Sequence, residues 1–405
     1  MININEIISK ELSLEFKFVE NALGLHIEGA TLPFIARYRK EATGSMNEDQ
    51  LRNVFERWEY LTELEERKDV ILKTIDSQGK LTDELKSKIE NCMHKNELED
   101  LYLPYKPKRR TRATIAIEKG LKPLAEFIES INIFSSPEIN LNKIAEEYIN
   151  LEKGVNSAAE ALAGASDIIA EEISENAELR KWLREYLFRY GIFSSKIKDE
   201  FPVGSTKYEM YREFICPVSR IKSHNMLALR RGETEGIIVF DIKIDEEEVY
   251  NYFQKKLIKS SRENIIGFIR AAIMDSFKRL MKNSITSEIR LERKGYADEE
   301  SIKVFEANLR NLLLSAPAGM KPVLGIDPGF RTGCKCTALD RTGKYLEYSA
   351  IFPFMSDNAK QKAAEILINM ICNHDIELIA IGNGTAGRET EEFVKNTIEN
   401  LKKKY

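Results

Sequence analysis

The sequence Val323-Leu-Gly-Ile-Asp-Pro-Gly-Phe-Arg-Thr-Gly333 is the strongest indication of the architecture of the C-terminal part of this chain. Its apolar first half predicts a short buried strand that ends on the carboxylate of Asp327. Pro328 stops the strand because proline has no backbone N–H to donate to a sheet. Gly329 and Gly333 then permit positive φ in a tight turn. The stretch predicts either a functional strand end in an α/β domain or, more simply, a strand closed by a polar turn.

The residues after this turn favour the first interpretation. They predict strands over 334–339 and 344–352, a helix over 356–373, a strand over 376–381 and a helix from Glu389 onward. The order β-β-β-α-β-α is that of the ribonuclease-H-like fold and differs from simple α/β alternation. A complete fold of this type continues with another strand and helix, so we expect a truncated domain with an exposed sheet edge.

The first 320 residues predict helices almost throughout. Asn47 and Gln50 form a capping pair at the start of a helix that runs to about residue 77 and stops at Gly79. The spacing of its apolar residues fits one core-facing helix or, alternatively, a coiled-coil arm. Further helices are expected over 82–94, 157–176, 177–190, 246–258, 264–282 and 297–314. Residues 236–244 predict a strand, for which the irregular stretch before it is the expected partner.

Composition excludes several classes of protein. The formal net charge is −4 over 405 residues, so a nucleic-acid role must rest on local clusters of cations. No run of eighteen apolar residues and no signal-peptide core are present, which predicts a cytoplasmic protein without a membrane partner. The five cysteines are scattered and the four histidines are isolated from one another. The sequence therefore predicts reduced thiols, no metal centre and no cofactor.

Two basic segments are candidate nucleic-acid contacts. The first lies between Pro33 and Gly44, is expected to be a loop, and contains Arg37, Arg39 and Lys40. The second is expected to be an extended loop, because Pro104 and Pro107 forbid a regular helix. Its candidate residues are Tyr105, Lys106, Lys108, Arg109, Arg110 and Arg112. Such cations suit a phosphate backbone and tyrosines can stack on bases. The alternative is a solvated loop, or one whose arginines pair with acidic helices of the same domain.

Five segments together closely resemble the bacterial Tex family of transcription accessory proteins. They are Pro33–Gly44, Leu101–Ala113, Ser223-His224 with Arg231-Gly-Glu233, Asp275–Leu280 and Gly325–Lys335. The resemblance implies a mostly α-helical N-terminal region with a helix-turn-helix-like part, followed by a YqgF-type ribonuclease-H-like α/β domain. It also implies RNA or DNA as partner, possible contact with the transcription machinery, and no small-molecule substrate. Complete members continue into helix-hairpin-helix modules and an RNA-binding OB-fold.

The resemblance divides the chain into three parts. We expect a Tex-like helical region over 1–200, a central helical region over 201–318 and a YqgF domain over 319–405 that is truncated at its C-terminus. Pro317 and Gly319 mark the clearest boundary between them.

Nuclease chemistry needs several carboxylates to hold two divalent ions. Asp327 stands where the first would lie and is the only metal candidate, because Asn383, at the end of the fourth strand, is neutral. Glu389 lies farther on, in the following helix. We therefore expect a non-catalytic nucleic-acid-binding scaffold. The alternatives are a metal-dependent nuclease whose other ligands are missing by truncation, and a nucleotide-binding turn over 382–387 with Arg388 as its only cation.

Overall fold

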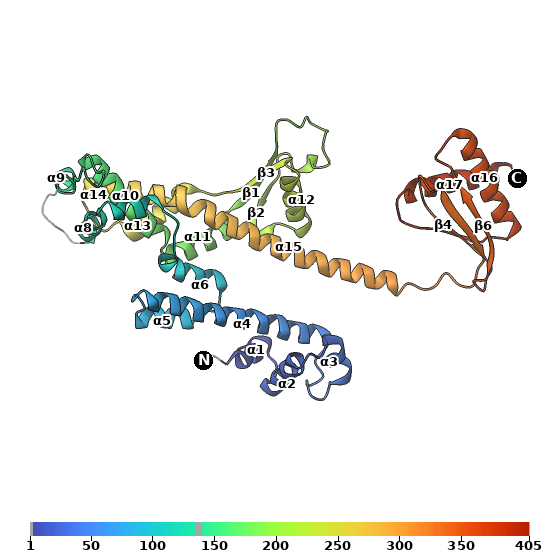
Figure 1. Cartoon of the computed structure of the whole chain (residues 1–405), viewed down its shortest axis with the longest axis horizontal. Helices are drawn as coiled ribbons and strands as arrows, with labels where there is room; N and C mark the ends of the chain where they lie inside the picture. The colour runs from blue at the N-terminus through green and yellow to red at the C-terminus, as the bar shows by residue number, and fades with distance from the viewer. Residues whose placement is uncertain (1–2, 134–139, 405) are drawn as a thin grey trace. The chain divides into compact units, whose positions relative to one another are not determined.

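The structure is a computed structural model that describes residues 3–133 and 140–404. The chain forms two compact units, Met1–Val304 and Phe305–Tyr405 (Figure 1). The first is almost entirely helical and the second contains a mixed sheet with two helices. This confirms the predicted fold class, whereas the predicted division at residue 200 stays a prediction. Among the described helices, none combines the length and apolar character needed to cross a membrane.

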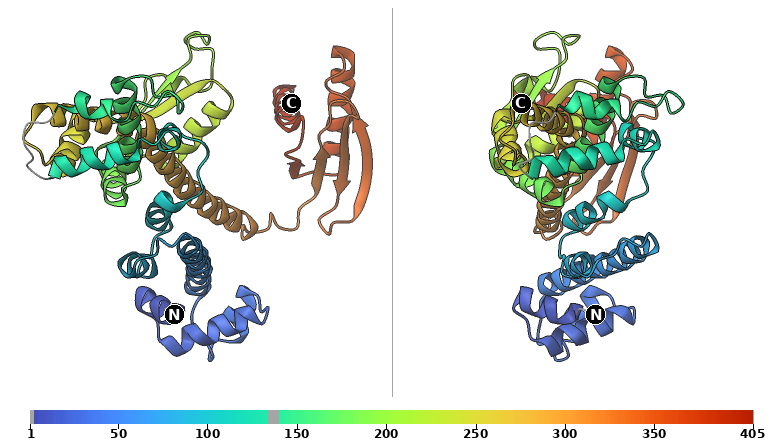
Figure 2. Two further views of the ribbon diagram at one scale, coloured as in Figure 1. Left: turned by 60° about the vertical axis from the view of Figure 1, so that its left-hand side comes forward. Right: turned by 90° about the vertical axis from the view of Figure 1, so that its left-hand side faces the viewer.

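A long helix organises the N-terminal helices. Their bounds are α1 Ile4–Leu12, α2 Phe16–Ile27, α3 Leu32–Tyr38, α4 Glu48–Ser77, α5 Asp83–Glu90 and α6 Lys95–Tyr102, followed by a short 3-10 turn over Leu103–Tyr105. Asn47 and Gln50 form the predicted capping box of α4. α1, α2 and α3 pack along one side of α4 (Figures 1 and 2). The helix therefore faces a core rather than forming a coiled-coil arm.

The first basic segment is not the loop expected from Pro33 and Gly44. Residues 32–38 form α3, with Pro33 in its first turn, where the missing N–H of proline breaks no helical hydrogen bond. Only the turn after Tyr38 is irregular.

A second core lies in the central helices. Their bounds are α7 Arg112–Glu118, α8 Lys122–Ile133, α9 Leu141–Glu146, α10 Ala158–Ser174, α11 Ala177–Tyr190, α13 Glu246–Leu257 and α14 Glu263–Asp275. α10 packs against α7, α8, α9 and α14. Its small residues allow this close packing, since a Cβ on Gly164 would lie 2.3 Å from the Leu121 side chain. This core is separate from the core around α4.

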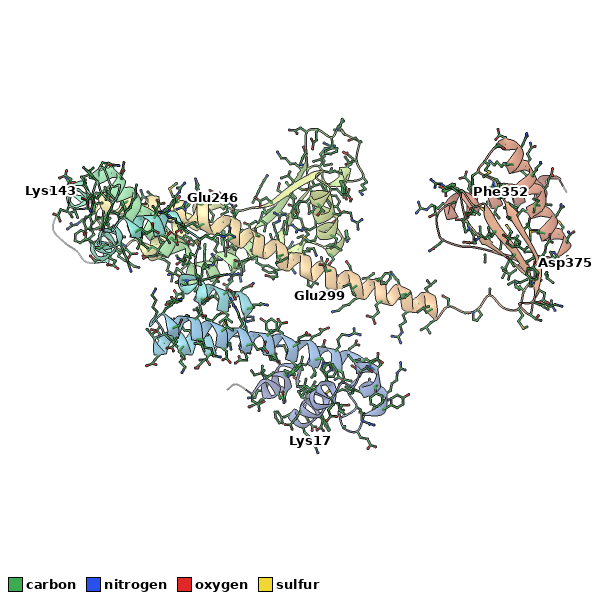
Figure 3. The ribbon with its side chains drawn as sticks, viewed as in Figure 1. Lys17, Lys143, Glu246, Glu299, Phe352 and Asp375 are labelled. Carbon is green, nitrogen blue, oxygen red and sulfur yellow. The ribbon has the colours of Figure 1, made fainter. Side chains whose placement is uncertain are left out.

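Two helices expected separately form one continuous element. α14 passes through a π-helical segment, Ser276–Met281, into α15, Lys282–Leu313. The prediction of two separate helices, ending at residue 282 and beginning at residue 297, is wrong. α15 continues through these residues and accommodates Gly295 in its interior. Residues 302–314 are exposed, and Figure 3 shows the side chains projecting beyond Glu299.

A small antiparallel sheet adjoins the central core. Its strands are β1 Ile192–Ile197, β2 Ile215–Pro217 and β3 Ile238–Lys243, in the order β2-β1-β3, and α12, Ser223–Thr234, packs on β3. The predicted strand at 236–244 exists, but its expected partner is wrong: β3 pairs with β1, along its whole length. The sequence of β1, Ile-Phe-Ser-Ser-Lys-Ile, hides the strand because serine and lysine interrupt its apolar pattern.

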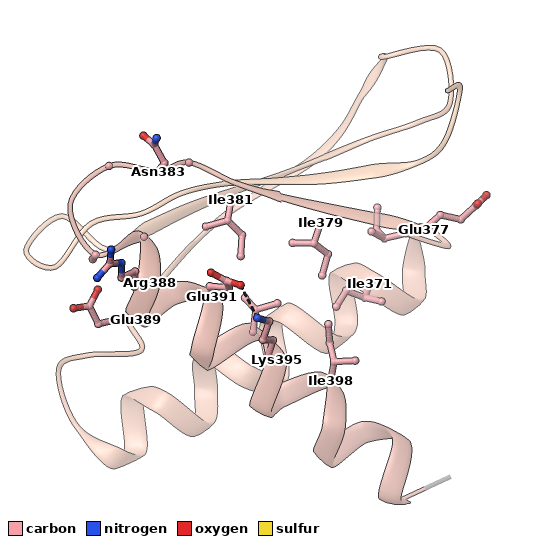
Figure 4. Close-up of a pocket in the computed structure, with 16 residues that line it drawn as sticks. Ile371, Glu377, Ile379, Ile381, Asn383, Arg388, Glu389, Glu391, Lys395 and Ile398 are labelled. Carbon is pink, nitrogen blue, oxygen red and sulfur yellow. Dashed lines mark hydrogen bonds and ion pairs between the residues drawn. The ribbon is translucent and has the colours of Figure 1, made fainter. Parts of the chain in front are cut away.

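The second unit has the predicted strand and helix order. Its elements are β4 Val323–Asp327, β5 Cys334–Leu339, β6 Tyr345–Ile351, α16 Asp357–Asn373, β7 Leu378–Ile381 and α17 Gly387–Lys404. The sheet order is β6-β5-β4-β7, with β4 and β7 parallel and the other pairs antiparallel. Gly333 has φ of 76°, as expected, whereas Gly329 does not have positive φ. Both helices cover the same face of the sheet (Figure 4).

Candidate nucleic-acid interface

The second basic segment is partly committed to the protein itself. Nζ of Lys108 lies 2.8 Å from Oε1 of Glu171 and also pairs with Glu175, both on α10 or at its C-terminal end. Partial burial lowers the pKa of Lys108, but the hydrogen bonds to these two carboxylates outweigh burial and raise it overall. Lys108 therefore anchors the segment to α10 and is not free to bind phosphate. Glu171 and Glu175 are four residues apart, so their carboxylates lie on the same side of the end of α10. This acidic pair is the sequence feature that could have indicated a basic partner.

Three cations of the same segment remain available. Lys106, Arg109 and Arg112 are exposed, and none makes an ion pair with a residue that the structure describes. Arg110 pairs with Glu118 at 2.9 Å, but both side chains are more than half exposed, so this pair holds Arg110 only weakly. Lys108 holds the segment against α10, and the neighbouring cations Lys106, Arg109 and Arg112 face solvent.

Tyr105 has a structural role in addition to its place beside the cations. Its ring is half-buried against the N-terminal core and its carbonyl oxygen accepts a hydrogen bond of 2.8 Å from the Gln78 amide. The proline pair does prevent a long helix, as predicted, but the segment is shorter than expected: α6 and a 3-10 turn reach Tyr105, and α7 begins at Arg112. Thr111 and Thr114 cap α7 reciprocally and fix where the segment ends.

The first basic segment surrounds the C-terminal end of α3. Arg37 is in the last turn, Arg39 is the C-cap, and Lys40 follows in the turn. All three are exposed and make no ion pair within residues 3–133 and 140–400. Two exposed aromatic rings, Phe34 and Tyr38, share this helix end. Sequence reasoning missed them, although their i, i+4 spacing in Pro-Phe-Ile-Ala-Arg-Tyr places them on one helix face.

Asp327 lies at the end of β4, where it was expected. Its side chain is 76% exposed, and Nζ of Lys335 on β5 lies 3.8 Å from its carboxylate. A magnesium pair needs several oxygen ligands, whereas this site offers one carboxylate and an ammonium group. In the described part of the chain, no group of three or more histidine, cysteine or acidic side chains could hold a metal ion. These residues do not fit a two-metal nuclease site.

A groove of about 1010 Å³ runs beside β7 and the start of α17. Ile379, Ile381 and Ile398 line it, and Asn383 points to the side opposite the two strand isoleucines (Figure 4). The turn over 382–387 closes one end, with Arg388 and Glu389 next to each other. Three carboxylates, of Glu377, Glu389 and Glu391, line the groove together with two cations, Arg388 and Lys395, and Lys395 pairs with Glu391. This excess of negative charge makes the groove a poor site for a nucleotide phosphate, which needs donors and positive charge.

The fold and these sites define a class: a mostly helical protein with exposed basic segments and a ribonuclease-H-like domain that lacks an assembled metal site among its described residues. Three family models match it: the Tex-like protein N-terminal domain over residues 2–76, the Tex central region over 136–305 and the Tex protein YqgF-like domain over 321–405. The chain belongs to the Tex family.

Individual relatives agree with this assignment. The chain is 42% identical to the uncharacterized protein YdcI of Bacillus subtilis over 398 residues, covering 98% of this chain and 55% of the relative. It is 38% identical to the transcriptional accessory protein Tex of Neisseria gonorrhoeae over 405 residues, which cover 99% of this chain and 52% of the relative. A human relative, S1 RNA-binding domain-containing protein 1, is 27% identical over 409 residues, which cover 97% of this chain and 40% of the relative. The chain thus spans about half the length of the bacterial relatives.

Proposed function

We propose that this chain is a nucleic-acid-binding, non-catalytic scaffold that acts as a transcription accessory protein in the cytoplasm. The observation that carries this proposal is the segment in which Lys106, Arg109 and Arg112 face solvent while Lys108 is anchored to α10. Cations that make no ion pair with the described residues can bind phosphate without first breaking an internal contact, and the anchored Lys108 limits the motion of the segment that carries them. RNA or DNA is the proposed ligand.

Two names support the proposal by similarity alone. One relative is named a transcriptional accessory protein and another is named for an S1 RNA-binding domain. The transcription machinery is therefore the proposed setting. A nuclease is the second candidate, because the family model of residues 321–405 describes a YqgF-like domain. The single carboxylate beside Lys335 argues against it.

The salt dependence of binding tests the proposal. We would measure fluorescence anisotropy of labelled single-stranded RNA, single-stranded DNA and duplex DNA over a series of KCl concentrations. The triple variant Lys106→Ala/Arg109→Ala/Arg112→Ala should bind all three ligands more weakly. Its plot of log K against log salt should be flatter by about one for each phosphate that the protein no longer neutralises. A control triple, Lys73→Ala/Lys360→Ala/Lys362→Ala, removes exposed lysines from other helices. An unchanged slope in the first triple would refute the proposal.

A further inference from the structure

The C-terminal end of α3 carries aromatic rings where a surface normally carries polar groups. Tyr38 is 67% exposed and Phe34 is 39% exposed. Their ring centroids lie 5.4 Å apart. The intervening Ile35 and Ala36 are buried in the N-terminal core, so the two rings are on the outer side of the helix. Contact of apolar ring surface with water is unfavourable, and a ligand that covers both rings removes this cost.

Cations surround these rings. The guanidinium of Arg39 lies 5.1 Å from the centroid of Phe34, over one face of its ring. Arg37 and Lys40 are exposed on either side of Tyr38 along the chain. The negative end of the helix dipole accounts for cations at this helix end, but it does not account for the two exposed rings. Together, the rings favour a ligand with a planar group and the cations favour a ligand with negative charge.

The turn that follows α3 is rigid. The side chain of Thr43, fully buried, donates a hydrogen bond of 3.1 Å to the Arg39 carbonyl oxygen. The Asn21 amide donates one of 2.9 Å to the Ala42 carbonyl oxygen and ties the turn to α2. Gly44 has φ of +60°, and a Cβ there would lie 2.5 Å from the Phe18 ring. The backbone that carries Arg39 and Lys40 is therefore held in place before any ligand arrives, which lowers the backbone entropy lost on binding.

We propose that the end of α3 binds single-stranded nucleic acid by stacking. One base stacks on the exposed face of Tyr38. The neighbouring ring of Phe34, with the guanidinium of Arg39 over one face, forms the other side of the binding site. Arg37 and Lys40 contact the phosphates on either side of that base. A duplex cannot stack a base on these rings, because its bases already stack on one another and hide their faces. The inference rests on the proposed nucleic-acid function and adds to it a preference for single strands.

The test compares single strands with duplex on the whole chain. In Phe34→Ala/Tyr38→Ala, affinity for labelled oligo(dT) or oligo(rU) should fall by about 5- to 100-fold, the range expected for loss of a stacked base. Affinity for duplex DNA should stay within about twofold. Tyr345→Ala is the matched control, since this tyrosine is 59% exposed on β6. Far-UV circular dichroism confirms that each variant is folded. The oligo(dT) and oligo(rU) arms show whether the sugar matters.

A fluorescence readout separates stacking from charge. The emission of Tyr38→Trp, after subtraction of the parent protein, should be quenched by oligo(dT), and that of Tyr345→Trp should not. An equal loss of single-strand and duplex binding, or no quenching, would overturn the inference. If the ring variants bind normally while the Lys106/Arg109/Arg112 triple does not, the stacking site is wrong and the proposed function stands. If the parent chain binds no oligonucleotide, both are wrong.

Discussion

Arg180 on α11 and Asp100 on α6 form a buried ion pair, with Nε 2.6 Å from Oδ1 and side chains only 6% and 5% exposed. Arg180 also reaches Glu288 on α15 at 2.8 Å, and Arg184 bridges the same two carboxylates. α6 belongs to the N-terminal core and α11 to the central core. A polar network therefore joins two separately formed apolar cores.

Removal of one partner from this network should destabilise the chain strongly. We expect Arg180→Ala to lower the free energy of unfolding by up to about 3–5 kcal/mol, since the buried Asp100 carboxylate loses one of its two arginine partners and keeps only Arg184. Urea unfolding followed by circular dichroism measures this. The control Arg110→Ala breaks an exposed pair with Glu118 and should cost less than about 1 kcal/mol. Similar losses in both variants would show that the buried pair has no special role.

Lys108 should matter for stability more than for binding. Lys108→Ala leaves Glu171 and Glu175 facing each other with their side chains 12% exposed, so we expect a loss of about 1–3 kcal/mol at pH 8. Its effect on duplex affinity should be smaller than that of Arg109→Ala, which removes a free cation. Thermal unfolding and fluorescence anisotropy on both variants give the comparison. A larger binding defect in Lys108→Ala would mean that its ion pairs open when nucleic acid binds.

Glu129 on α8 should make stability depend on pH near neutrality. Burial, together with the neighbouring Glu172 carboxylate, raises the pKa of Glu129 to about 7 from an ordinary value of 4.5. Between these values the folded chain binds more protons than the unfolded chain, so stability falls as pH rises from about 5 to above 7. The loss should be of the order of 1–3 kcal/mol, because a tenfold change in proton affinity corresponds to about 1.4 kcal/mol.

Glu129→Gln is the variant that tests this. It keeps the shape of the side chain and removes its charge, so the variant should be the more stable protein at pH 8 and lose most of its advantage at pH 5. Unfolding midpoints in urea at both pH values show the difference. Parallel pH profiles for the two proteins would contradict the assignment.

Asp327 should not support cleavage. We expect no product from labelled RNA, DNA or junction substrates in Mg²⁺ or Mn²⁺, because one carboxylate paired with Lys335 cannot hold two ions. Asp327→Asn should bind nucleic acid as the parent does. Product formation that disappears in Asp327→Asn would establish a nuclease.

The second unit should open locally more easily than the first. β7 is hydrogen-bonded to β4 on one edge, and the groove beside it leaves Ile379 and Ile381 partly exposed. We expect fast amide hydrogen exchange over 376–400 and strong protection in α10, which is enclosed by four helices. Uniform protection of both segments would show that β7 is as stable as the central core.

Local structure could be predicted from the amino-acid sequence wherever the pattern of residues is periodic or chemically specific. The capping pair at Asn47 and Gln50 set the start of α4, and the run that ends at Asp327 set β4 and its acidic end. The order of strands and helices along the second unit also followed from apolar runs separated by turns, whereas the order of the strands within the sheet did not. Each of these depends on neighbouring residues, so no knowledge of distant contacts was needed.

Which charged residues are free to bind a ligand depends on the folded chain and could not be predicted from the sequence. Lys108 and Arg109 are adjacent and chemically alike, yet Lys108 is bound by carboxylates more than sixty residues away and Arg109 faces solvent. β1 was hidden in the sequence for the same reason, because its register with β3, not its own composition, makes it a strand. Ion pairing and strand pairing join residues distant along the chain, so burial and partners appear only once the chain has folded.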